Sequence, residues 1–231
     1  HLLEVTPAAR ERTVLIYNGI EPDGFQPTRS REQVRAELGL PPDCLLVGAV
    51  GQIVPWKRQD VFIEAAAIIV ARMPRSHLLV VGADLFGEHS DYGRELRSLA
   101  EMLNVGSRVI FTGYREDVAS VMAALDVLVH PAEDEPLGRV LLEAMSLGVP
   151  CVAASSGGPA EIIEDGVSGM LVTPGDVNGF AREVCELLER PGAARRLGEA
   201  GRARVQSHFL ASRMARLIED LYEEALAEAL L

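Results

Sequence analysis

Short apolar runs alternate with longer amphipathic runs along almost the whole chain, and this alternation constrains the fold most strongly. Most of the short runs are apolar on both faces, as in LLVGAV and DVLVH. Strands of this kind are buried on both faces, which is typical of a parallel sheet covered by helices on each side. We predict strands at Thr13–Tyr17, Leu45–Val50, His77–Val81, Arg108–Thr112, Asp126–His130, Cys151–Ala154 and Met170–Val172. We predict helices at Arg31–Leu38, Asp60–Arg72, Tyr92–Leu103, Asp117–Ala124, Arg139–Leu147, Pro159–Glu164, Val177–Glu189, Ala193–Gln206 and Ser212–Leu230.

This order of elements predicts an α/β fold, a doubly wound, Rossmann-like parallel sheet of six or seven strands with helices on both faces. The chain has 231 residues, which suits one large domain. Beyond Pro191 only helices are predicted, and the stretch YNGIEPDGFQP near the start has the composition of a linker. Ligands of such sheets bind beyond the carboxyl ends of the strands, so the loops there are the candidate site.

Composition excludes several classes of protein. The net charge of −12 argues against nucleic acid or an anionic membrane as a partner. The longest apolar run, Val61–Ala71, is too short to span a bilayer, and no signal peptide opens the chain. Three widely spaced cysteines suit reduced thiols, so we expect a cytoplasmic protein. Because the chain starts with His1, we expect it to be a piece of a longer protein.

The loop after Leu45–Val50 carries the only lysine of the chain. It reads GQIVPWKRQD and leads from Gly51 through Lys57 into a predicted helix. A glycine turn before a helix N-terminus is a general anion site, and a compact ammonium group is suited to phosphate. The alternative is a surface lysine beside the tryptophan that packs the loop.

The loop after Asp126–His130 carries a second set of candidates. It reads PAEDEPLG, and Glu135 lies in it, eight residues before Glu143 on the following helix. The free N–H groups of that helix could hold an anion, and Glu143 could accept hydrogen bonds from ligand hydroxyls. Taken alone, either glutamate is more often a solvated acid. His130 faces the same side of the sheet, although a lone histidine there is more often structural.

Three other chemistries fit this loop less well. An acid cluster can hold a hard cation, but a helix N-terminus suited to anions follows this one. A glycosidase acid and base would need a carboxyl separation that the sequence does not supply. Nucleophilic catalysis has little support, because Cys151 begins a buried strand and no Ser/His/Asp arrangement is present.

Taken together and in order, the segments carry a family resemblance. VLIYNGIEPDGF, VGAVGQIVPWK, LLVVG, RVIFTGYREDV, DEPLGRVLLEAMSLGVPCVA and GGPAEIIEDGVSGMLV resemble the C-terminal, donor-binding domain of retaining glycosyltransferases of the GT-B fold, in glycosyltransferase family 4. The resemblance runs from about Val14 to the last helix. The spacing from Glu135 to Glu143 matches that family's E-x₇-E signature.

The resemblance implies a role for each matching residue. Glu143 resembles the glutamate that binds the ribose hydroxyls of the sugar nucleotide, and Glu135 the catalytic one that faces the transferred sugar. Lys57 resembles the diphosphate-binding lysine. The remaining donor-binding positions would be Gly51 and Gln52, the backbone of Tyr114 and Arg115 at the base, and the amides of Leu137, Gly138, Arg139 and Val140 at the distal phosphate.

One position departs from the family pattern. The family usually has Gly-Arg where this chain has Gly51-Gln52. An uncharged glutamine implies weaker or differently organised diphosphate binding, for which Arg58 could partly substitute. The resemblance implies a sugar nucleotide as donor, with no metal and no other cofactor. The base, the sugar and the acceptor are not indicated.

The resemblance also implies a domain organisation. Residues 1–24 would be an interdomain strand and linker, residues 25–210 the nucleotide-sugar-binding domain, and residues 211–231 a helix that crosses back to an N-terminal domain. That missing domain would bind the acceptor and carry any peripheral membrane association, so this chain alone would be inactive. Two alternatives remain open: a non-enzymatic nucleotide-binding regulatory module, and another GT-B enzyme such as a sugar phosphorylase.

Overall fold

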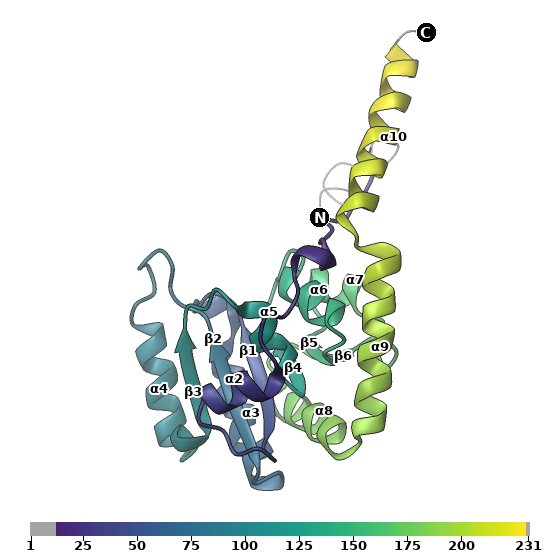
Figure 1. Cartoon of the computed structure of the whole chain (residues 1–231). Coiled ribbons are helices and arrows are strands. Elements are labelled where there is room, and N and C mark those ends of the chain that lie inside the picture. Colours follow the sequence, from purple (N-terminus) through teal and green to yellow (C-terminus); the bar gives the residue numbers. More distant parts are fainter. Residues whose placement is uncertain (1–12, 230–231) are drawn as a thin grey trace.

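A six-stranded parallel sheet forms the centre of the computed structural model, which describes residues 13–229. Its strand order is β3-β2-β1-β4-β5-β6, and every neighbouring pair is parallel (Figure 1). The strands are β1 (Leu45–Val50), β2 (Ser76–Val81), β3 (Val109–Gly113), β4 (Val127–His130), β5 (Cys151–Ala154) and β6 (Met170–Val172). The predicted doubly wound α/β fold is therefore confirmed.

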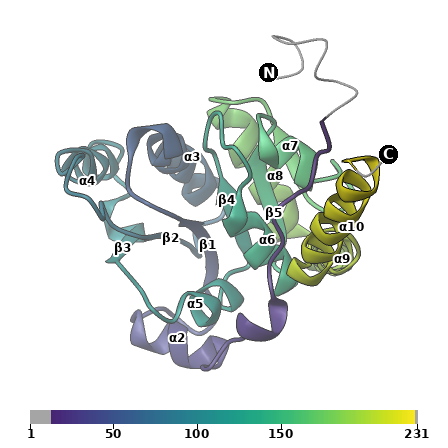
Figure 2. The ribbon, with the colours of Figure 1, turned by 90° about the horizontal axis from the view of Figure 1, so that it is seen from above.

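Helices cover both faces of the sheet. One face carries α3 (Gln59–Arg72), α4 (Tyr92–Met102) and α8 (Val177–Glu189), while α2 (Arg31–Glu37), α5 (Val118–Ala123), α6 (Arg139–Ser146) and α7 (Gly158–Ile162) lie on the other. Viewed from above, the sheet runs between these two layers (Figure 2). The helix α9 (Pro191–His208) packs against α6 and α8.

Successive strand residues enter opposite halves of the core, which explains the continuous apolar runs. Val47 lies in one buried cluster and Leu46 in the other, and Leu78 and Leu79 divide in the same way. Each side chain is fully buried because helices cover both faces. This burial stabilises the sheet that holds the loops beyond β1 and β4.

The chain reverses its winding direction between β1 and β4. These strands are neighbours in space but are separated by β2 and β3 along the chain. The loops that leave their carboxyl ends part to opposite sides of the sheet, and ligands bind at such switch points. The two loops singled out from the sequence are the ones that meet there.

The predicted strand Thr13–Tyr17 does not form. Residues 13–18 form no strand, and Val14 and Leu15 are exposed. An extended segment needs a neighbouring strand to build a ladder, and no strand of the described sheet lies beside this one. The first contact of this kind is the isolated bridge between Ile20 and Leu210. Residues 1–12, which belong to the predicted linker, lie outside the described residues.

The last helix, α10 (Ala211–Ala229), projects away from the rest of the molecule (Figure 1). Leu217, Leu221 and Leu226 on it are exposed. Within residues 13–229 no helix combines the length and hydrophobicity that a membrane span requires.

Candidate active site

Lys57 and Glu135 form an ion pair at the switch point. Lys57 lies in a 3₁₀ turn (Pro55–Lys57) after β1, and Glu135 lies in the loop after β4. The Lys57 ammonium also lies 4.1 Å from the centroid of the Trp56 ring. His130, the last residue of β4, places Nε2 3.2 Å from the same Glu135 oxygen. Residues 78 positions apart thus form one buried polar cluster.

The electrostatics of this cluster keep Glu135 ionised. Burial opposes the charged form, but hydrogen bonds from His130 and Lys57, together with the lysine charge, lower the pKa of Glu135 to about 2. Burial lowers the pKa of His130, so a neutral imidazole donates its Nε2 proton to the carboxylate. The site therefore pairs the carboxylate of Glu135 with the ammonium group of Lys57.

Further contacts bind the two loops to each other. The Glu133 amide donates to the Trp56 carbonyl at 3.2 Å, and Arg58 pairs with Glu133. Arg58 has a left-handed backbone (φ 53°) and also donates to Asp60 at 3.2 Å. Its guanidinium is therefore held at the edge of the site by two carboxylates. In the acidic stretch from Glu133 to Glu135, which could have been a cation site, Glu133 pairs with Arg58 and Glu135 with Lys57.

The entry to α6 is shaped by glycines from two loops. Gly138 precedes α6 with φ 90°, and Gly158 donates its amide to the Glu135 carbonyl at 2.7 Å. A Cβ at Gly157 would meet that carbonyl at 2.3 Å, and a Cβ at Gly158 would meet the Leu137 backbone at 2.3 Å. Only glycine permits this close approach, which holds the turn after β5 against the loop that enters α6.

Glu143 lies one turn into α6, apart from the Lys57 cluster. Arg139 Nε donates to it at 2.9 Å, and both residues line a cavity of about 370 Å³. The other wall is the linker from Gly19 to Phe25 together with Ala211. Burial raises the pKa of Glu143, and the Arg139 charge only partly offsets this effect. The carboxylate is thus available to hydroxyl donors in the cavity.

The other predicted donor-binding residues line a second cavity, of about 150 Å³. Gly51 and Gln52 from the loop after β1 meet Tyr114 and Arg115 from the loop after β3 there. The Gln52 carbonyl accepts from Gln59 at 2.7 Å, which fixes this loop on α3. The walls are otherwise mostly apolar, with Val50, Val81, Leu85 and Val118 among them. Such walls suit a flat aromatic ring.

The structure thus distributes the predicted residues over three places. Lys57 and Glu135 pair at the switch point, Glu143 and Arg139 lie along α6, and Gly51, Gln52, Tyr114 and Arg115 line the smaller cavity. Sequence reasoning missed the supporting contacts of Gly157 and Gly158, for which the GGP motif after β5 was the available signal. It also missed the partners of Arg115, described below.

Cysteines and grouped metal ligands are the other candidates for chemistry in the described residues. All three cysteines are buried and free, and burial raises the pKa of Cys151. Between residues 13 and 229, no three His, Cys, Asp or Glu side chains are grouped as metal ligands. A doubly wound domain with a buried lysine–glutamate pair at its switch point, a helix N-terminus beside it and two cavities has the features of domains that bind phosphorylated ligands.

Comparison with known proteins identifies the family. The chain belongs to the glycosyl transferases group 1, whose family model matches residues 30–204. It is 37% identical over 193 residues to the lipopolysaccharide core biosynthesis glycosyltransferase LpsE of Rhizobium meliloti, covering 84% of this chain and 53% of that protein. It is 35% identical over 195 residues to the D-inositol 3-phosphate glycosyltransferase of Mycolicibacterium smegmatis, covering 84% and 44%.

Solved structures agree with this assignment. Anabaena Alr3699/HepE in complex with UDP has a TM-score of 0.86 and 33% identity over 93% of this chain and 58% of that one. The same protein has also been solved with UDP-glucose. WaaG, a glycosyltransferase involved in lipopolysaccharide biosynthesis, has a TM-score of 0.76 and 30% identity, covering 90% and 56%. These neighbours are GT-B glycosyltransferases, and the chain spans about half the length of the curated relatives it matches.

Proposed function

We propose that the chain is the donor-binding half of a retaining, metal-independent glycosyltransferase of family 4. The observation that carries this proposal is the Lys57–Glu135 pair, placed at the switch point beside the N-terminus of α6. A cation and free amides suit a diphosphate, and a buried ionised carboxylate suits a sugar that develops positive charge. The complexes of Alr3699/HepE with UDP and UDP-glucose support a nucleotide sugar as the donor.

Each part of the site has a proposed role toward that donor. Lys57 and the amides of Leu137 to Val140 bind the diphosphate. Glu143 accepts hydrogen bonds from the ribose hydroxyls, which its half-buried position between the linker and α6 supports. The smaller cavity takes the base against Gly51, Gln52 and the backbone at Tyr114 and Arg115.

The chemistry follows from the charges. As the bond between sugar and diphosphate breaks, negative charge builds on the distal phosphate and positive charge on the sugar. The Lys57 ammonium has three N–H donors, so it can keep Glu135 and bind phosphate at the same time. Glu135 orients the sugar and favours its cationic character without becoming covalently attached to it. No step requires a metal ion.

The acceptor is proposed to enter from a separate N-terminal domain, so we expect this chain alone to bind donor without transferring sugar. We also propose that the complete protein is cytoplasmic. The second candidate function is a non-enzymatic nucleotide-binding module, which Gln52 favours because its side chain brings no positive charge to the diphosphate. A sugar phosphorylase remains the third.

A transfer assay on the full-length protein separates these functions. We expect transfer from a nucleotide sugar in the presence of EDTA, with a product of the same anomeric configuration as the donor, read by proton NMR. Nucleotide binding without transfer would favour the regulatory module. Sugar release that requires inorganic phosphate would favour the phosphorylase.

A further inference from the structure

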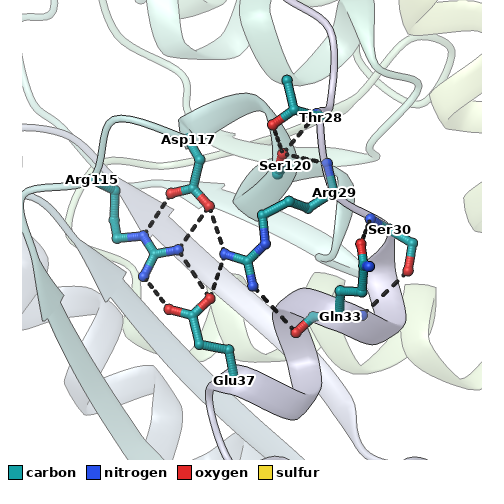
Figure 3. Close-up of polar contacts among 8 residues, drawn as sticks. All are labelled: Thr28, Arg29, Ser30, Gln33, Glu37, Arg115, Asp117 and Ser120. Atoms are coloured by element: carbon teal, nitrogen blue, oxygen red, sulfur yellow. Dashed lines mark hydrogen bonds and ion pairs between the residues drawn. The ribbon is translucent and has the colours of Figure 1, made fainter.

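Four charged residues form a closed cluster beside the smaller cavity (Figure 3). Arg115 donates from Nε and Nη2 to Asp117, both at 2.8 Å, and from Nη1 to Glu37 at 2.6 Å. Arg29 pairs with Glu37 and donates to Asp117 at 3.0 Å. Two guanidinium groups thus share two carboxylates, and the cluster is neutral overall. Such a network restrains its members more strongly than an isolated surface pair does.

The cluster joins parts of the chain that are distant in sequence. Glu37 is the last residue of α2, Asp117 precedes α5, and Arg115 belongs to the loop after β3. The backbone beside Arg29 is fixed as well, because the amides of Thr28 and Arg29 donate to Ser120 Oγ at 3.0 and 3.2 Å (Figure 3). The loop after β3 is therefore held against two helices of one layer.

The loop after β3, which the cluster restrains, forms one wall of the smaller cavity. At its start, the Gly113 carbonyl accepts from the Gly82 amide at 3.0 Å, and Gly113 has a left-handed backbone (φ 70°). At its end, Arg115 is held by Glu37 and Asp117. Tyr114 lies exposed between these two anchors, and both Tyr114 and Arg115 line the cavity. The shape of this wall depends on both anchors.

We propose that Glu37, Asp117 and Arg29 are positioning residues for nucleobase selection. By holding the Arg115 side chain, they set the backbone of Tyr114 and Arg115 against the base, although none of the three lines the cavity. This inference rests on the proposed function, since it assumes that a nucleotide occupies the site. In this proposal the Arg115 side chain holds the loop in place, and the Arg115 backbone contacts the base.

The rival explanation is that the Arg115 guanidinium itself binds the nucleotide. In the structure its Nε, Nη1 and Nη2 atoms each donate a hydrogen bond to Glu37 or Asp117. Figure 3 shows the guanidinium turned toward these carboxylates. The two explanations predict opposite changes in nucleotide affinity when a carboxylate of the cluster is removed. If Arg115 bound phosphate directly, removing a competing carboxylate would tighten nucleotide binding. If the cluster positions the loop, the same change weakens binding and relaxes the choice of base.

Calorimetry on the 231-residue chain with UDP, GDP and ADP tests the inference. For Glu37→Gln and Asp117→Asn we expect the Kd of the preferred nucleotide to rise about five- to tenfold, with smaller differences among the three bases. Arg115→Lys keeps the charge but loses the planar fork, and we expect the same relaxation. Hydrogen exchange of the amides from Gly113 to Asp117 should quicken, while that of β5 stays unchanged.

The matched control is Glu189→Gln, which breaks an exposed ion pair with Arg72 of 2.8 Å far from the cavity. Unchanged base selection, unchanged loop exchange, or tighter binding in the cluster variants would overturn the inference. A wild-type chain that binds all three nucleotides equally would overturn it too. Absence of any nucleotide binding in the wild type would count against the proposed function instead. Hydrogen exchange of the loop after β3 would still test whether the cluster restrains that loop.

Discussion

Glu135 shares its buried position with one cation, Lys57. Replacing Lys57 with methionine leaves a buried carboxylate whose only remaining side-chain partner in the cluster is His130. We expect the free energy of unfolding to fall by about 1–3 kcal/mol at neutral pH, the usual cost of an unpaired buried group. Urea unfolding measures this loss. Arg75→Met, at an exposed ion pair with Asp43, is the control and should change little.

The pH dependence of that loss has a definite sign. The folded pKa of Glu135 is lowered from 4.5 to about 2, so its stabilisation is complete above the ordinary value and disappears as the pH falls toward about 2. The difference between wild type and Lys57→Met should therefore be largest at neutral pH and smaller at about pH 3. A difference that is constant over this range would contradict the pairing.

Glu143 should show the opposite behaviour. Burial raises its folded pKa, so this residue favours the folded state at low pH and loses that contribution as the pH rises through the raised value. We expect Glu143→Gln to raise the melting temperature at neutral pH, with no gain at about pH 4. The same variant should weaken nucleotide binding about tenfold, because a neutral amide accepts hydrogen bonds less strongly. A variant that melts below wild type at neutral pH would contradict this account.

At the residue scale, motifs could be predicted and partners could not. The candidates Lys57, Glu135 and Glu143 came from loop position and family spacing. The pairing of Lys57 with Glu135, and of Arg115 with Glu37, joins residues 78 positions apart in each case. Such contacts depend on how helices pack on the sheet, which local patterns do not encode. Arg58 illustrates this limit, since Glu133 and Asp60 already hold the guanidinium that was expected to assist the diphosphate.

At the scale of elements, the GGP turn after β5 supports the loop of Glu135. Gly158→Ala would place a Cβ 2.3 Å from the Leu137 backbone, so one of the two loops must move. We expect a loss of about 1–3 kcal/mol in unfolding free energy by overpacking, together with weaker nucleotide binding. Urea unfolding and calorimetry measure the two effects. Gly192→Ala, whose Cβ would meet only a flexible arginine tip, should lower neither of them.

The predicted bounds of the strands and helices agree best with the structure where helices cover both faces of the sheet. The strands β1, β5 and β6 and the helix α8 have the predicted bounds, because a continuous apolar run or a regular amphipathic period marks them. The predicted strand Thr13–Tyr17 failed because a strand requires a neighbour to pair with. The 3₁₀ turn that carries Lys57 escaped prediction, since Pro-Trp-Lys has no periodic signal of its own.

At the scale of the whole molecule, the doubly wound order brings distant loops to one edge. The switch between β1 and β4 places the diphosphate and sugar candidates together, and the loop after β3 adds a wall for the base. The apolar residues on α10 and the exposed Val14 and Leu15 fit the proposed contact with an acceptor-binding domain. The fold class was predictable from the sequence because it depends on this global order rather than on any one contact.

Calorimetric titration of the chain with UDP, GDP and ADP in magnesium-free buffer tests the central claim most directly. We predict that at least one of these nucleotides binds, and that Lys57→Ala and Glu143→Ala each weaken it about tenfold or more while both variants remain folded by circular dichroism. The Arg75→Met variant, at an exposed ion pair, should bind as wild type does. Binding of none of the three by the folded wild-type chain would contradict the account.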